Sequence, residues 1–271
     1  MSLVAATRAE STKQFTTSMW WLLGVILVAY VGFTASALGF ALGGSTTGAF
    51  GTGQGPVLAP EDLPGLLYSS ATSVGYVFPL LIGTLIVTSE FRHKTLTSTF
   101  LATPRRGIVL GAKLLVGAFL GLLYGIVGIV AAVGPSSAFL AGFGLETELT
   151  SPDTWAMLGR MLLSYVLWVL IGIGVGALVR NQVGAIVGVL VFTQFIEPIV
   201  RTAAGFIDGL SDAVRFLPGA ASDSLVGTSI FTLAASTGSS LSWWAAGLVL
   251  LAYAAVLLAL GYLTTWRRDV S

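Results

Sequence analysis

Long apolar runs alternate with short polar segments along almost the whole chain. Six of these runs are long enough to cross the roughly 30 Å hydrocarbon core of a bilayer, which takes about 20 helical residues. The runs cover residues 19–42, 66–88, 107–133, 155–179, 183–200 and 243–266. The pattern predicts an all-α integral membrane protein whose six transmembrane helices form a single domain over residues 19–271.

The segment ahead of the first run, residues 1–18, predicts a short interfacial helix. It carries Arg8, Glu10 and Lys13 and is followed by the Trp20-Trp21 pair. This composition is typical of a helix that lies along the inner membrane face with its tryptophans at headgroup level. A frayed N-terminal tail is the alternative, because chain ends are often poorly ordered.

Two of the connecting segments are long. The glycine-rich residues 43–65 predict a flexible loop, which has no Gly-Lys-Ser/Thr and therefore is not a phosphate-binding loop. Residues 201–241 hold apolar runs too short to span a bilayer, broken by Pro218-Gly219. This second segment predicts short re-entrant or outer helices between spans 5 and 6.

Composition agrees with the membrane class. The chain is 55% hydrophobic and 9% charged, whereas soluble domains are about 25% charged. The absence of cysteine and the single histidine, His93, exclude disulfides, thiolate chemistry and a histidine-rich metal site. The sequence Ala35-Ser36-Ala37 resembles a signal cleavage site, but the run 19–42 is longer than the roughly 7–15-residue core of a signal peptide. We therefore interpret that run as a membrane helix.

The charges predict the orientation of the chain. An even number of spans places both termini on one side, which then carries ten of the 13 basic residues: Arg8, Lys13, Arg92, Lys94, Arg105, Arg106, Lys113, Arg180, Arg267 and Arg268. Basic loops remain in the cytoplasm. We therefore expect residues 1–18, 89–106, 180–182 and 267–271 on the cytoplasmic side of the cell membrane, and the loops 43–65 and 201–241 outside.

The stretch VTSEFRHKTLTSTFLATPRR at residues 87–106 is the most polar part of the chain. Six ionisable side chains fall within it: Glu90, Arg92, His93, Lys94, Arg105 and Arg106. Pro104 disfavours a helical conformation at Thr103. We interpret residues of about 89–103 as a short cytoplasmic helix between spans 2 and 3.

This stretch, followed by Gly-Ala-Lys-Leu-Leu at residues 111–115, resembles the permease subunit of ABC-2 type transporters. In that family the pattern S-E-[FY]-R-x-x-T-[LI]-x-x-[TS]-[LF]-x-x-[TS]-P-x-R marks the coupling helix, which docks on a separate ATPase. The matching residues are Glu90, Arg92, Thr95, Thr99, Pro104, Arg106 and Lys113. Arg8, Glu10 and Lys13 also resemble a pattern common in the family's elbow helix.

The resemblance implies the transport subunit of an ATP-driven exporter, not an enzyme. The chain lacks G-x-x-x-x-G-K-[ST], so ATP and Mg are expected on separate nucleotide-binding subunits, with no catalytic, cofactor or metal site here. Expected partners are those ATPase subunits, a second permease half, identical or similar, and the lipid bilayer, with no nucleic acid. The residues expected to couple to the ATPase are Glu90, Phe91, Arg92, Lys94, Thr95, Thr99, Pro104 and Arg106. Alternatively, Glu90 is only a favourable charge near a helix N-terminus.

The central parts of the six spans lack Lys, Arg, Asp and Glu, which predicts a hydrophobic or amphipathic substrate such as a drug, lipid or peptide-like molecule. The candidate pathway residues are aromatic and amide side chains of spans 2 and 5: Tyr76, Phe78, Phe192, Gln194 and Phe195. Ordinary helix packing is the alternative for each of them. Glu197 and Arg201, at positions i and i+4, predict a local ion pair.

Glycines at four-residue intervals in the third span, Gly117, Gly121 and Gly125, predict a helix face that a neighbouring backbone approaches closely. The competing explanation is that glycine is common in membrane helices.

Two other functions stay open from the sequence. An ion-driven secondary transporter would place ionisable residues near the middle of the membrane, where none is found. A membrane scaffold or sensor that has an ATPase partner but transports nothing is the other alternative.

Overall fold

The computed structural model describes residues 2–49, 59–204, 206–207, 209–231 and 240–266. Within these ranges the chain is all-helical, and six helices are long and apolar enough to cross a membrane. They are Met19–Thr46, Pro60–Arg92, Arg106–Gly142, Pro152–Leu178, Gln182–Ala203 and Trp243–Thr264. The predicted all-α class and the six spans are confirmed at this level, and they indicate a multi-pass membrane protein.

Most of the helices follow one another with few residues between them, but residues 47–59 separate α2 from η1 and residues 143–151 separate α6 from α7. In chain order they are α1 (Leu3–Thr16), α2 (Met19–Thr46), η1 (Pro60–Asp62), α3 (Leu63–Gly75), α4 (Val77–Arg92), α5 (Leu96–Ala102), α6 (Arg106–Gly142), α7 (Pro152–Leu178), α8 (Gln182–Val191), η2 (Phe192–Ile196), α9 (Glu197–Ala203), α10 (Leu210–Val214), α11 (Pro218–Val226), α13 (Trp243–Gly261) and η3 (Tyr262–Trp266). The region predicted to hold short helices, 201–241, contains α10 and α11, both shorter than a span.

Helix α7 lies at the centre of the bundle, where it packs against α4, α6 and α13. Its Tyr165 and Trp168 side chains are among the largest fully buried ones. Glycines bring α4 and α7 into backbone contact: a Cβ added to Gly83 would overlap the Val169 carbonyl, and one added to Gly172 would overlap the Leu80 carbonyl. Small residues at such crossings allow the close packing that stabilises helix pairs within a membrane.

Helix α6 is longer than the sequence predicted. The predicted span ended at Val133 before a loop from Pro135, but the helix continues through Pro135 to Gly142. The rings of Phe139 and Phe143 lie against Gly39 and Gly43 of α2, with their Cδ2 atoms 3.4 Å and 2.6 Å from the Cβ position of each glycine. This packing favours the helical conformation beyond a proline, which local propensity alone would place at a helix end.

Two spans are irregular. The second span breaks at Tyr76, between α3 and α4, and the fifth contains the π-helical turn η2 before α9. Pro79 and Pro198 follow these irregularities and have no N–H to donate to the carbonyl four residues earlier, a common cause of such breaks. The Tyr76 hydroxyl donates to the Thr193 carbonyl at 3.0 Å, so the two irregular regions are in contact.

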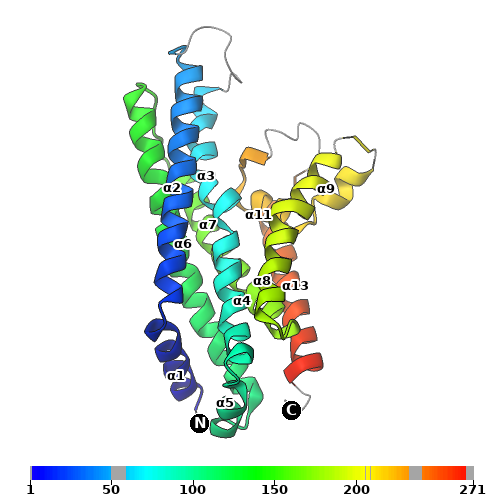
Figure 1. The fold of residues 1–271 in the computed structure, drawn as a ribbon. Helices are drawn as coiled ribbons and strands as arrows, with labels where there is room; N and C mark the ends of the chain where they lie inside the picture. The colour runs from blue at the N-terminus through cyan, green and yellow to red at the C-terminus, as the bar shows by residue number, and fades with distance from the viewer. Residues whose placement is uncertain (1, 50–58, 205, 208, 232–239, 267–271) are drawn as a thin grey trace.

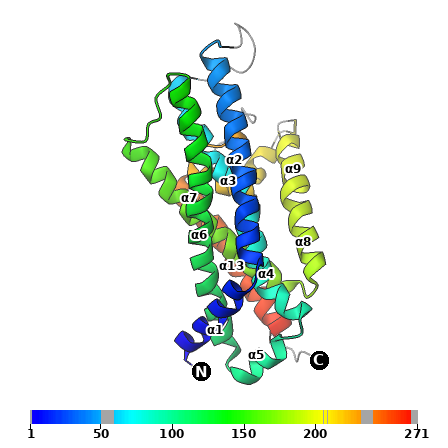
Figure 2. The same cartoon turned by 60° about the vertical axis from the view of Figure 1, so that its left-hand side comes forward.

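Helices α1 and α5 lie at one end of the bundle, together with the end of α13 (Figure 1). Helix α9 lies toward the opposite end, where α2 and α6 reach farther than any part of α9 or α11 in both views (Figure 2). Helix α1 meets α2 at a bend around Thr17 and Ser18 and packs chiefly on α6. The polar stretch found in the sequence therefore shares one end of the molecule with the N-terminal helix.

Candidate functional site

Four charged side chains from three separate helices meet at the end of the bundle that holds α1 and α5. We call Glu10, Lys13, Glu90 and Lys113 the inner ion cluster. The Lys113 ammonium lies 2.6 Å from Glu10 Oε1 and 3.1 Å from Glu90 Oε2. The Lys13 ammonium lies 2.8 Å from Glu90 Oε1 and 3.5 Å from Glu10 Oε2. Two acids and two bases alternate, so the cluster is neutral overall.

Three of the four side chains in this cluster are buried. Lys113 is 0% exposed and also donates to the Ile86 carbonyl at 3.2 Å, while Glu10 and Glu90 are nearly as buried. Removing one member of a buried ion pair typically costs about 3–5 kcal/mol, because the remaining charge has no partner. The cluster therefore fixes how α1, the end of α4 and the start of α6 sit relative to one another.

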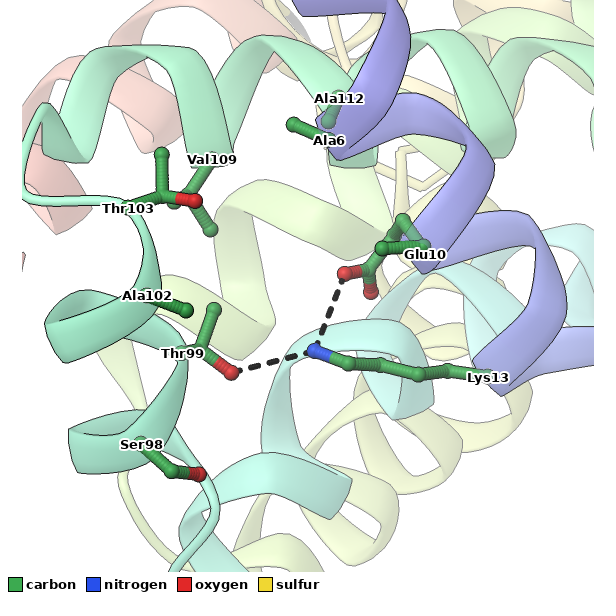
Figure 3. Close-up of a pocket in the computed structure, with 10 residues that line it drawn as sticks. Ala6, Glu10, Lys13, Ser98, Thr99, Ala102, Thr103, Val109 and Ala112 are labelled. Carbon is green, nitrogen blue, oxygen red and sulfur yellow. Dashed lines mark hydrogen bonds and ion pairs between the residues drawn. The ribbon is translucent and has the colours of Figure 1, made fainter. Parts of the chain in front are cut away.

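Lys13 extends the cluster to α5. Its ammonium donates to the Thr99 hydroxyl at 3.1 Å, and the same hydroxyl lies 3.4 Å from Glu90 Oε1. A cavity of about 210 Å³ lies between α1, α5 and α6, with small side chains such as Ala6 and Ala102 on its walls (Figure 3). Figure 3 shows Lys13 bridging Glu10 and Thr99 across one side of this cavity. Movement of α5 must therefore be transmitted to α1 or break this bridge.

The charge state of Lys13 favours the bridge. Burial lowers the pKa of Lys13, but the hydrogen bond to Glu90 and the nearby Glu10 carboxylate outweigh that effect, so its pKa lies above the ordinary value. Lys13 is therefore protonated at neutral pH. Because the folded-state pKa is raised, the stabilisation from this group is present at neutral pH and is lost only as the pH rises through the raised pKa.

The stretch predicted as one helix at about 89–103 is two helices with a turn between them. Residues up to Arg92 complete α4, and α5 begins only at Leu96. Lys94 in the turn has a φ of 55°, which a non-glycine residue rarely adopts. Thr103 ahead of Pro104 is extended, with φ −136° and ψ 87°, as expected for a residue before proline.

The predicted ATPase-coupling residues divide between a buried and an exposed group. Glu90 is buried, Phe91 is half-buried against the core, and Thr99 contacts the inner ion cluster. Arg92, Lys94, Thr95 and Pro104 are exposed, and the Arg106 guanidinium lies 5.0 Å from the centre of the Phe100 ring.

Sequence reasoning noticed Glu10, Lys13 and Lys113 only as parts of local patterns. Their pairing joins residues 77 and 103 positions apart, so spacing along the chain carries no signal for it. A buried lysine in an apolar run is the one hint, because such a charge must find a partner.

The candidate pathway residues do not gather around one cavity. Tyr76 and Phe78 are buried; the Tyr76 ring stacks on Trp168 at 4.6 Å, and the Phe78 ring lies 6.0 Å from that of Tyr30. Phe192 lines a mainly apolar cavity of about 240 Å³ with Trp168 and Tyr253.

Gln194 and Phe195 face away from the bundle and are exposed, Phe195 by 62%. In the monomer these two side chains belong to an outer surface of span 5. A pathway that includes them would have to lie between this surface and a second subunit.

The predicted local pair of Glu197 with Arg201 is wrong. Arg201 instead forms an ion pair with Asp223 of α11, at 2.5 Å. Glu197 Oε1 accepts a hydrogen bond from the Ala220 N–H at 3.1 Å, at the N-terminus of α11, where a carboxylate is electrostatically favoured. Tertiary packing of α11 onto span 5 thus outweighs the helical i, i+4 spacing.

We call Ser73, Glu197, Arg201 and Asp223 the outer polar group. Asp223 lies at its centre. Its Oδ1 is 3.5 Å from the Ser73 hydroxyl of α3, so the group joins α3, α9 and α11. Burial raises the pKa of Asp223 above its ordinary value, although the Arg201 guanidinium opposes part of that rise.

The predicted packing glycines Gly117, Gly121 and Gly125 all face α7. Cβ atoms added to them would lie 2.5 Å from Ile173 Cδ1, 2.8 Å from Val166 Cα and 2.9 Å from Leu162 Cδ2, respectively. A side chain at Gly121 would meet the backbone of α7 and push the two helices apart, whereas at Gly117 and Gly125 it would first displace the ends of the Ile173 and Leu162 side chains.

By its fold the chain belongs to the class of multi-pass helical membrane proteins. No protein-family model matches the chain, and no curated protein matches it significantly. Among the described residues, no three His, Cys, Asp or Glu side chains are grouped to hold a metal ion. The predicted C-terminal cytoplasmic segment, 267–271, lies outside the described residues.

Proposed function

We propose that this chain is the permease subunit of an ATP-driven exporter of the ABC-2 type. It moves a hydrophobic or amphipathic substrate out of the cytoplasm or the inner leaflet. The residue pattern of the polar stretch is the source of this proposal. The observation that supports it best is the inner ion cluster, which connects the short helix α5 to three helices of the bundle through Lys13, Glu90 and Thr99.

In this proposal α5, with the turn before it, acts as the coupling helix. It has the properties that docking on an ATPase requires: it lies at the end of the bundle (Figure 1), and its outer face is exposed. Leu101 is 79% exposed there, an apolar side chain beside polar Thr97 and Ser98. ATP and Mg are held by the separate nucleotide-binding subunits, and α1 serves as the elbow helix on the cytoplasmic membrane face.

A second permease half completes the pathway. Phe192, Phe195 and Gln194 are on the exposed surface of span 5, which is where a pathway between two halves requires them. Closure of the ATPases would move α5, and the inner ion cluster would carry that movement to α1 and α6. Helices α10 and α11 would form the outer mouth as the short helices between spans 5 and 6.

The test uses the tagged chain purified from its native membrane. We expect an ATPase subunit to co-purify and to hydrolyse Mg-ATP. Leu101→Asp on α5 should lower the recovery of that subunit at least about tenfold, since a charge at an apolar contact costs more than about 1.4 kcal/mol. The matched control is Phe206→Asp at the opposite end, where Phe206 is 86% exposed. Equal recovery from both variants would show that the ATPase docks elsewhere.

The outer polar group favours one rival, an ion-driven transporter, because Glu197 and Asp223 are buried carboxylates in contact with three helices. Reconstituted vesicles separate the two functions. Transport that needs ATP and withstands ionophores fits the exporter. Transport that proceeds without ATP and stops when ionophores collapse the ion gradients would instead indicate an ion-driven transporter.

A further inference from the structure

A second cavity lies beside the bend between α1 and α2, on the other side of Lys13 from the cavity of Figure 3. It measures about 480 Å³, within the range of small-molecule sites, and is lined by α1, the start of α2, α4 and the start of α8. Its polar lining includes Lys13, Arg92, His93 and Gln182. Ile82 and Leu85 form an apolar wall. The cavity shares Lys13 and Glu90 with the inner ion cluster and Arg92 and Thr95 with the proposed coupling residues, but neither role accounts for the space itself.

The cavity has one excess positive charge. Lys13 and Glu90 both line it, but they are paired with each other within the inner ion cluster, so the excess charge comes from Arg92. Arg92 is exposed, and no ion pair joins its guanidinium to another side chain in the part of the chain that the structure describes. The charge of Arg92 is therefore available to an anion.

The start of α2 adds backbone donors. Ser18 at the N-cap makes no side-chain hydrogen bond to the helix, and the first turn has no acidic residue. The first backbone bond into the helix is from the Leu22 N–H to the Ser18 carbonyl, so the N–H groups of Met19, Trp20 and Trp21 have no cap among the described residues. Free N–H groups at the start of a 28-residue helix bind phosphate well.

Gln182 makes a separate demand on the ligand. It is 6% exposed, lines the cavity, and its Oε1 is buried without a hydrogen-bond partner in the described structure. A buried acceptor of this kind costs about 1–3 kcal/mol unless a donor reaches it. A ligand that fits therefore carries an anionic group and a hydrogen-bond donor, and beside the cation Arg92 a neutral hydroxyl is favoured over an ammonium group.

The position of the cavity identifies the source of that ligand. The cavity lies where α1 turns into the first span, and Met19 on its wall is followed in the chain by Trp20 and Trp21, residues typical of headgroup level. The apolar wall of Ile82 and Leu85 suits the glycerol and upper acyl carbons of a lipid. An acidic side chain of an ATPase would reach the exposed face of α5 more directly than this recess.

We propose that this cavity binds the headgroup of an anionic phospholipid that carries free hydroxyls, such as phosphatidylglycerol. The phosphate lies between Arg92 and the N-terminus of α2, and a headgroup hydroxyl donates to Gln182 Oε1. The bound lipid would hold the α1–α2 bend at the membrane surface whether or not the chain transports anything.

The test is lipid retention. The wild-type chain is placed in nanodiscs with equal amounts of phosphatidylglycerol and phosphatidylcholine, and native mass spectrometry identifies the lipid that remains bound on release. We expect selective retention of phosphatidylglycerol. Arg92→Gln should reduce that retention about tenfold, since a hydrogen bond to a charged group is typically worth that factor. The matched control is Lys94→Gln, a nearby exposed cation that does not line the cavity.

A second variant tests the hydroxyl. Gln182→Ala should weaken phosphatidylglycerol retention while leaving retention of phosphatidic acid, which lacks the headgroup glycerol and its hydroxyls, unchanged. Unaltered thermal unfolding shows that both variants are folded. Equal retention of the two nanodisc lipids, or equal effects of Arg92→Gln and Lys94→Gln, would overturn the proposal. So would displacement by inorganic phosphate with no lipid preference, which marks an adventitious ion only, or an Arg92→Gln variant that loses ATPase binding and keeps its lipid.

Discussion

At the scale of single residues, Lys113 holds the inner ion cluster together. Its ammonium contacts both carboxylates, it has no exposed surface, and it lies about two turns inside α6. Lys13 contacts the same carboxylates, but its side chain is 42% exposed. Water can therefore replace part of the stabilisation that Lys13 gives to these carboxylates. The two lysines therefore make unequal contributions although their partners are the same.

Replacing Lys113 by methionine should destabilise the protein by about 3–5 kcal/mol, because Glu10 and Glu90 would be left buried without their main counter-charge. Equilibrium unfolding in mixed micelles measures the loss. The control, Lys94→Met at an exposed turn, should change stability by no more than about 0.5 kcal/mol. Adding Glu10→Gln to Lys113→Met should recover part of the loss. Similar stability of the two single variants would contradict the assignment.

At the scale of helices, the packing of α6 on α7 depends on where glycine occurs. Gly121 lies against the backbone of Val166, whereas Gly134 in the same helix has nothing within 4 Å of its Cβ position. The same substitution should therefore have opposite effects at the two sites.

Gly121→Ala should destabilise the bundle by about 1–3 kcal/mol, because the added methyl forces the helices apart. Gly134→Ala should be neutral or stabilising by up to about 1 kcal/mol, since alanine is the better helix former. Melting temperatures of the two purified variants, compared with wild type, show directly whether each substitution stabilises or destabilises the protein. A loss at Gly134 as large as that at Gly121 would mean that backbone flexibility, not close packing, explains these glycines.

The sequence was informative about elements and much less so about their contacts. Apolar length and charge located six spans, and the residues before Pro104 located the end of α5. The extension of α6 past Pro135 was missed because it depends on rings packing against Gly39 and Gly43 of another helix. Arg201 was paired wrongly for the same reason: its partner Asp223 is distant in sequence.

At the scale of the whole molecule, the positions of the charges predict which end faces the cytoplasm. Because the chain has no cysteine, single cysteines can be introduced cleanly. Ser98→Cys on α5 and Thr150→Cys between α6 and α7, both exposed, should react with impermeant maleimide from opposite sides of the membrane. Ser98 is expected inside and Thr150 outside. Labelling of both from one side would exclude the six-span topology.

The length of α6 has a consequence for the shape of the molecule in a bilayer. At about 1.5 Å per residue, its 37 residues extend roughly 55 Å. Even at a typical tilt of about 20°, that exceeds the roughly 40–45 Å thickness of a bilayer with its headgroups. Part of α6 therefore projects beyond the bilayer, and α2 and α6 reach farther than α9 along one flank of the molecule (Figure 2). A molecule released at that end would be screened by protein on one side and would leave across the open flank.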